Sequence, residues 1–190
     1  MSKFDERLDK VLDRVTSNEL LSGRGLGNEI GFYIFDYPPE RELAVRDHIQ
    51  FLLAQVPKRS PGIRVKHINL FDLVIDHLES RNLLDKALDQ ARRKGDAFLV
   101  KALEQPLHGS KLAQVFERFC DLENNDLFFT SGVGAIYPLL RTHTLLTNLH
   151  HVMRHKPLVL FFPGRYDGQS LRLFGQLKDD NYYRAFKLVP

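Results

Sequence analysis

Residues 126–167, DLFFTSGVGAIYPLLRTHTLLTNLHHVMRHKPLVLFFPGRYD, decide the fold of this chain. An apolar run at 127–129 meets a glycine-bearing turn at 131–134, and a helical pattern starts at Pro138. A second apolar run at 158–162 is closed by Pro163 and Gly164. This order predicts a strand, a crossover helix and a second, parallel strand. Because α/β proteins bind ligands and partners where the strands of the sheet end, we expect the functional site there.

The flanking segments continue this alternation of strands and helices. Residues 30–37, IGFYIFDY, predict a strand buried on both faces, and a helix follows from Pro39 to about residue 55, then a turn at 57–62. Residues 63–70 alternate like a half-exposed strand, and Asp72 is a candidate N-cap of the helix after it. Residues 170–175 and 182–189 predict a hairpin or a pair of edge strands. The fold class is therefore α/β, with three layers and a central, mostly parallel sheet.

A length of 190 residues suits a single α/β domain, residues 1–190. Residues 1–22 predict an N-terminal amphipathic helix, because Phe4, Leu8, Val11, Leu12 and Val15 recur at helical spacing. Residues 72–120 predict a helical insertion between two strands, with breaks at residue 95 and at 106–109.

Composition narrows the class of protein. The chain is 43% hydrophobic and 27% charged, its net charge is +3, and it has one cysteine, which excludes an internal disulfide. The charged N-terminus does not resemble a signal peptide, and no apolar run approaches the ~20 residues that span a bilayer. We therefore expect a cytoplasmic protein without a membrane partner. The C-terminal third is locally basic, which a solvated face explains better than a nucleic-acid site.

The sequence contains no recognisable catalytic, cofactor or metal site. The glycine turn after the strand at 127–129 lacks the Walker A pattern, and His151 and His155 lack a neighbouring carboxylate. Cys120 ends an apolar stripe and is expected in the core, and Ser131 lacks a G-x-S-x-G context. We therefore predict no enzyme activity and no cofactor. Asp36 and Arg141 are expected as a structural ion pair first and as a site second.

Arginine and tyrosine gather toward the C-terminus. Both residue types are enriched at protein interfaces, because they bury area and still form hydrogen bonds. A second explanation, with Tyr183 and Phe186 in the core and the arginines solvated, accounts for them equally well, and single-stranded nucleic acid is a third. The candidate partner-binding residues are Tyr137, Arg141, Arg165, Tyr166, Arg172, Tyr182 and Arg184.

Long blocks of the chain resemble the BrxB family of BREX phage-defence systems. The blocks are GNEIGFYIFDYPPERELAVRDHI, SGVGAIYPLLRTHTLLTNLHHV, KPLVLFFPGRYDGQSLRLFG and DDNYYRAF. The resemblance covers essentially the whole chain. The resemblance implies a component of a bacterial system that methylates host DNA and blocks phage replication. It implies no catalytic residues, and it implies partners among the other BREX proteins, with PglZ favoured.

From this resemblance we expect a non-catalytic assembly or adaptor subunit. The alternatives are a DNA-binding accessory subunit and a degenerate nucleotide-binding sensor. The order of elements is also similar to a P-loop NTPase core without Walker A. Residues 36–41 take the place of the phosphate loop, where Pro38 and Pro39 supply no N–H and Glu40 and Glu42 would repel phosphate.

Overall fold

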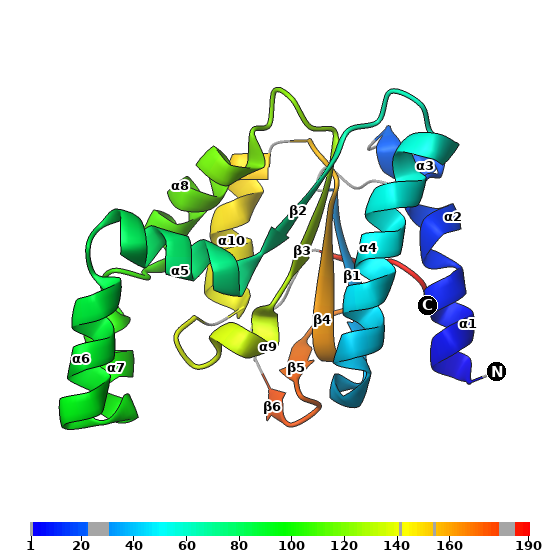
Figure 1. Cartoon of the computed structure of the whole chain (residues 1–190). Coiled ribbons are helices and arrows are strands. Elements are labelled where there is room, and N and C mark those ends of the chain that lie inside the picture. The colour runs from blue at the N-terminus through cyan, green and yellow to red at the C-terminus, as the bar shows by residue number, and fades with distance from the viewer. Residues whose placement is uncertain (1, 23–30, 141, 154, 179–184) are drawn as a thin grey trace.

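The computed structural model describes residues 2–22, 31–140, 142–153, 155–178 and 185–190, and it has three layers (Figure 1). The parallel strands follow the order β2-β3-β4-β1-β7, and an antiparallel β5–β6 extension pairs with β4. The strands are β1 Phe32–Tyr37, β2 Val65–Asn69, β3 Leu127–Ser131, β4 Leu158–Tyr166, β5 Leu171–Leu173, β6 Leu177–Lys178 and β7 Phe186–Lys187. The predicted α/β class with a mostly parallel sheet is confirmed, and the strand order is compatible with a degenerate P-loop NTPase-like core.

Helices cover both faces of the sheet and produce two separate apolar cores. Phe32 and Ile34 of β1 face a core built with α5, α8, α9 and α10. Tyr33, Phe35 and Tyr37 face a second core built with the N-terminal helices and α4. Burial on alternate faces explains why this strand is almost continuously apolar, as its sequence predicts.

The N-terminal amphipathic segment forms three short helices instead of one. They are α1 Lys3–Asp9, α2 Val11–Val15 and α3 Asn18–Leu21. The chain is extended at Ser17, whose hydroxyl accepts the N–H of Leu20 at 3.4 Å and caps α3. Val11, Val15 and Leu20 are all fully buried, so the segment keeps one apolar face although its axis is broken.

Two expected boundaries on the first half of the chain are wrong. After η1 Pro39–Arg41, α4 spans Glu42–Arg59 and runs through Pro57, where a turn was expected. A proline in the last turn removes a single helical hydrogen bond, and full burial of Val56 compensates. The next helix, α5 Leu70–Ser80, is capped by Asn69 and not by Asp72, because the Asn69 side chain accepts the N–H of Phe71 at 2.9 Å.

The helical insertion continues with α6 Leu84–Lys94, α7 Asp96–Leu103 and α8 Gly109–Cys120. Both expected breaks are present. Gly95 has a φ of 83° between α6 and α7, and residues 104–108 separate α7 from α8. Figure 1 shows α6 and α7 as a helical pair at the far end of α5, away from the sheet.

The stretch that decides the fold differs from expectation at both of its turns. After β3, a short helix, α9 Val133–Ile136, precedes a cis Tyr137–Pro138 bond, and α10 Thr142–Met153 starts later than Pro138. The backbone of Tyr137 is extended, because the ring of a following proline clashes with a residue in the helical conformation. β4 also continues through Pro163 and Gly164, since β5 joins it where its pairing with β3 has ended.

The two C-terminal runs belong to different parts of the sheet. β5 pairs with β4 and β6, whereas β7 pairs with β1 at the opposite edge. They do not form a hairpin with each other, and β5 is not an edge strand, because it pairs with β4 on one side and β6 on the other. Residues 182–184 of the second run lie outside the described residues. No described helix is long and apolar enough to cross a membrane.

Candidate protein-interaction site

The antiparallel β4–β5 pair places two of the predicted residues face to face. Arg165 on β4 lies directly opposite Arg172 on β5, and both side chains are exposed. Their strand neighbours Tyr166 and Leu171 are buried in the core beneath. A cavity of about 260 Å³ is lined by both arginines and by Asp167. The strand register thus places two arginines that are seven positions apart in the sequence directly opposite each other, where they form a cationic pair.

This arginine pair has no ion-pair partner among the described residues. Asp167, the acid in the same cavity, is engaged in its own turn. It accepts the N–H groups of Gln169 at 2.9 Å and Ser170 at 2.7 Å, and the Ser170 hydroxyl at 2.8 Å. The Ser170 and Gln169 hydrogen bonds lower the pKa of Asp167 to about 2, and the charge of Arg172 adds to this effect. Like charges directly opposite each other destabilise a strand pair. An anion that binds between the two guanidinium groups would relieve this repulsion, so the pair is suited to bind an anionic group.

Two exposed aromatic rings lie at the same end of the sheet. Tyr137 and Phe174 form an edge-to-face pair with centroids 6.4 Å apart, and they are 40% and 39% exposed. Phe174 packs closely on Gly134, where an added Cβ would lie 2.9 Å from the ring. A supported, half-exposed aromatic pair is typical of a protein interface. We call Tyr137, Arg165, Arg172 and Phe174 the hairpin surface.

Tyr166, also predicted to bind a partner, does not lie on this surface. It is fully buried, and its hydroxyl lies 3.0 Å from the carbonyl oxygen of Gly168 and 2.8 Å from that of Ala185. Its N–H donates to Asp36 at 3.0 Å. Tyr166 therefore holds the hairpin against the sheet. The remaining predicted residues, Arg141, Tyr182 and Arg184, lie outside the described residues.

Asp36 forms an ion pair with Arg7, whereas its expected partner, Arg141, lies outside the described residues. Arg7 Nη2 lies 2.6 Å from Asp36 Oδ1, and the same guanidinium donates to the carbonyl oxygens of Asp36 and Val189. The ion pair therefore joins α1, β1 and the C-terminal segment, which runs beside α1 in Figure 1. Sequence reasoning missed Arg7 because it lies 29 positions from Asp36 in an ordinary charged helix.

After β1, where a P-loop NTPase has its phosphate-binding loop, this chain has a contact between a tyrosine and a glutamate. The Tyr37 hydroxyl donates to Glu42 Oε2 at 2.6 Å, and Glu42 also pairs with Arg46 at 2.9 Å. Burial and the Glu42 hydrogen bond raise the pKa of Tyr37, so the phenol stays protonated. A carboxylate at this position disfavours a nucleotide phosphate.

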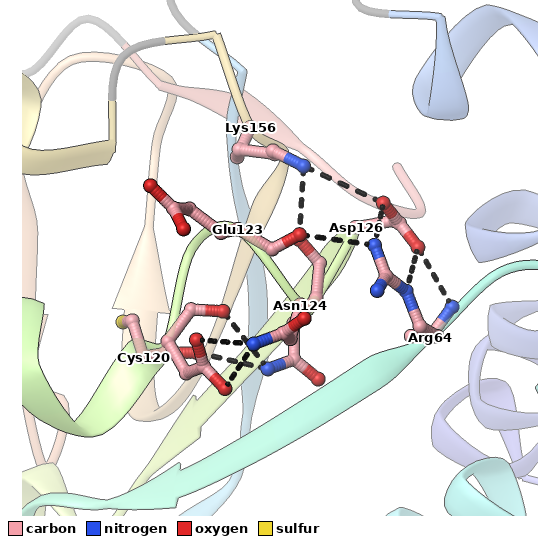
Figure 2. A network of polar contacts seen from close by, with 8 residues as sticks. Arg64, Cys120, Glu123, Asn124, Asp126 and Lys156 are labelled. Atoms are coloured by element: carbon pink, nitrogen blue, oxygen red, sulfur yellow. Dashed lines mark hydrogen bonds and ion pairs between the residues drawn. The ribbon is translucent and has the colours of Figure 1, made fainter.

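Other polar groups of the described chain have structural roles. Figure 2 shows Asp126 between two cations: Arg64 Nε at 3.0 Å and Lys156 Nζ at 3.4 Å, a network that ties together the starts of β2, β3 and β4. The Arg64 hydrogen bond is the main reason that the pKa of Asp126 falls to about 2. Cys120 is buried as expected, and burial raises the pKa of its thiol. The described residues contain no cluster of three or more metal-ligating side chains.

The fold and the hairpin surface define a three-layer α/β protein whose exposed arginine and aromatic residues gather at one end of the sheet. The chain belongs to the family described as BREX protein BrxB, whose model matches residues 66–188. A BrxB of Bacillus cereus (strain H3081.97) is 41% identical over 191 residues, covering 100% of this chain and 99% of the relative. A BrxB of Escherichia coli O9:H4 (strain HS) is 38% identical over 187 residues, covering 98% of this chain and 92% of the relative.

No solved structure matches. The resemblance to BrxB is confirmed, and the chain is a component of a BREX phage-defence system.

Proposed function

We propose that this chain is a non-catalytic assembly or adaptor subunit of its BREX system and that it binds PglZ through the hairpin surface. The observation that carries the proposal is the facing pair Arg165 and Arg172, which is exposed and has no ion-pair partner among the described residues. The half-exposed ring of Phe174, which packs edge-to-face on Tyr137, follows Arg172 by two positions. Such a surface fits acidic side chains on a partner, because guanidinium groups bind carboxylates through two parallel hydrogen bonds.

The other expected functions have less support. A nucleotide sensor would need phosphate-binding groups after β1, where Glu42 accepts from Tyr37. A DNA-binding subunit needs an extended basic surface, whereas the arginine pair is a local feature of a chain with a net charge of only +3. A protein partner therefore fits the described geometry best.

Co-purification with PglZ at moderate salt tests the proposal. The R165Q/R172Q variant removes both charges from the exposed strand pair without adding a carboxylate beside Asp167, so its folding stability should stay close to that of the parent chain while PglZ capture falls about tenfold or more. The control R92Q/R93Q makes the same charge change on α6, where both arginines are over three-quarters exposed, and should leave capture unchanged. Separate elution of the two parent proteins at micromolar concentration would contradict the proposal.

The single variant R165E separates binding from folding. It places opposite charges directly across β4 and β5, which should stabilise the strand pair by about 0.2–1 kcal/mol. Capture of PglZ should nevertheless fall, because an acidic partner would meet a glutamate. If binding and stability instead fall together, the arginine pair has only a structural role.

A further inference from the structure

The outer edge of β2 is open for pairing. β2 ends the strand order, and within the described residues its ladder is formed with β3 alone. The carbonyl of Arg64 faces β3, where it accepts the N–H of Leu127 at 3.2 Å. Because backbone groups alternate in direction along a strand, the N–H and C=O of Val65 and His67 face outward. In Figure 1 this edge lies between α5 and α4.

A cavity of about 410 Å³ runs along the same edge and is lined by residues of α4, β2, α5, α8 and the end of β3. His67 lines the cavity, and its Nε2 lies 2.8 Å from the Ser131 hydroxyl oxygen, a contact that fixes the end of β2 to β3. Burial lowers the pKa of His67, although the charge of Asp72 opposes this, so the imidazole is neutral at pH 7. Phe119, which is 39% exposed, also lines the cavity. The cavity is large enough for one long side chain of a neighbouring strand.

The charge of this cavity is opposite to that of the whole chain. Asp47, Asp72 and Asp76 line it, and none has an ion-pair partner among the described residues. On the cationic side, Arg46 is paired with Glu42 and leaves Lys66 as the opposing charge. A net negative cavity in a chain of net charge +3 favours a basic group from outside.

We propose that the edge of β2 binds an extended segment of another protein that pairs with it as an additional strand and inserts a lysine or arginine side chain into the cavity. The outward backbone groups supply the hydrogen bonds of strand addition, and the three aspartates select the basic residue. This surface lies on β2, whereas the arginines of the hairpin surface lie on β4 and β5, so it is a second contact beyond the proposed PglZ-binding function.

Site-specific photo-crosslinking in cells that express the complete BREX system tests the proposal. A benzophenone amino acid replaces Lys66 or Gln50, which line the cavity from β2 and α4, and replaces Lys86 on the exposed face of α6 as the control. We expect crosslinks at the first two positions, mapped by mass spectrometry to one lysine- or arginine-bearing segment of another protein. Products no stronger than those at Lys86, or products with a second copy of this chain, would overturn the proposal.

Two variants then test the chemistry of docking. Val65→Pro removes an outward N–H without touching the ladder to β3, and should lower crosslinking at Lys66 about tenfold, the change that ~1.4 kcal/mol corresponds to. Val65→Ala controls for the lost side chain, and the thermal midpoint of each variant verifies folding. D72N/D76N changes only exposed charges and should lower the yield similarly. Unchanged yields in both folded variants would refute strand addition with a basic anchor.

Discussion

The ion pair between Arg7 and Asp36 allows a quantitative test of how the N-terminal helix is held. The side chains are only 17% and 10% exposed, and the Nη2–Oδ1 distance is 2.6 Å. Arg7→Met removes the charge and keeps most of the aliphatic stem, so Asp36 is left as a buried carboxylate without a cation. Breaking a buried pair in this way costs about 3–5 kcal/mol. We use the lower limit, about 3 kcal/mol, because Tyr166 still donates its N–H to Asp36.

Thermal and urea unfolding measure this loss. For a chain of this size, 3 kcal/mol corresponds to a fall in Tm of about 6–12 °C. The matched control is Arg14→Met in the same N-terminal segment, whose partner Glu19 is 46% exposed, and it should lose less than about 1 kcal/mol. The double variant R7M/D36N should be more stable than the sum of its single variants predicts. Equal losses for Arg7→Met and Arg14→Met, or additive losses in the double variant, would refute this account of the N-terminal helix.

Three further predictions concern pH, backbone strain and packing. Asp126, whose pKa is about 2 mainly because of its hydrogen-bonded guanidinium partner, should stabilise the fold above the unfolded pKa of ~3.9 and lose this contribution as the pH falls toward 2. Urea unfolding at both ends of that range should show a smaller pH dependence for Asp126→Asn, and an unchanged slope would contradict the assignment. Gly132→Ala should cost about 2–3 kcal/mol, because φ is 82° and the new Cβ would lie 2.2 Å from the amide oxygen that caps α5. Gly62→Ala, with φ 99° and open space, measures the backbone strain alone and should cost about 1 kcal/mol. Phe116→Ala should cost about 3–5 kcal/mol because the ring is fully buried, whereas Phe119→Ala, one helical turn further on and 39% exposed, should cost less than half as much in the same assay.

Sequence patterns predicted the elements more reliably than their ends. The apolar runs became β1, β3 and β4, and the glycine at position 95 separates α6 from α7, as expected. The errors occur where tertiary contacts outweigh a local signal. Pro57 lies inside α4 because Val56 is buried, and Pro163 lies inside β4 because β5 pairs with the strand beyond it.

The candidate site was predicted in part. Tyr137, Arg165 and Arg172 are exposed at the end of the sheet, as a partner-binding surface requires, and their role remains a prediction. Tyr166 differs only because strand alternation turns it inward, next to Arg165, which turns outward. Composition could not decide between those two directions, because tyrosine suits both a core and an interface.

By itself, the sequence determined the α/β class, the two-sided burial of the central strands and membership of the BrxB family, because these depend on periodicity and on long blocks of residues. The tertiary structure alone decided which charges meet. It paired Asp36 with Arg7, opposed Arg165 to Arg172 without an ion-pair partner among the described residues, and left the edge of β2 open beside three aspartates. The physical reason is that strand register and helix packing bring together side chains from distant positions in the sequence. The spacing of residues along the chain does not predict which of these side chains come into contact.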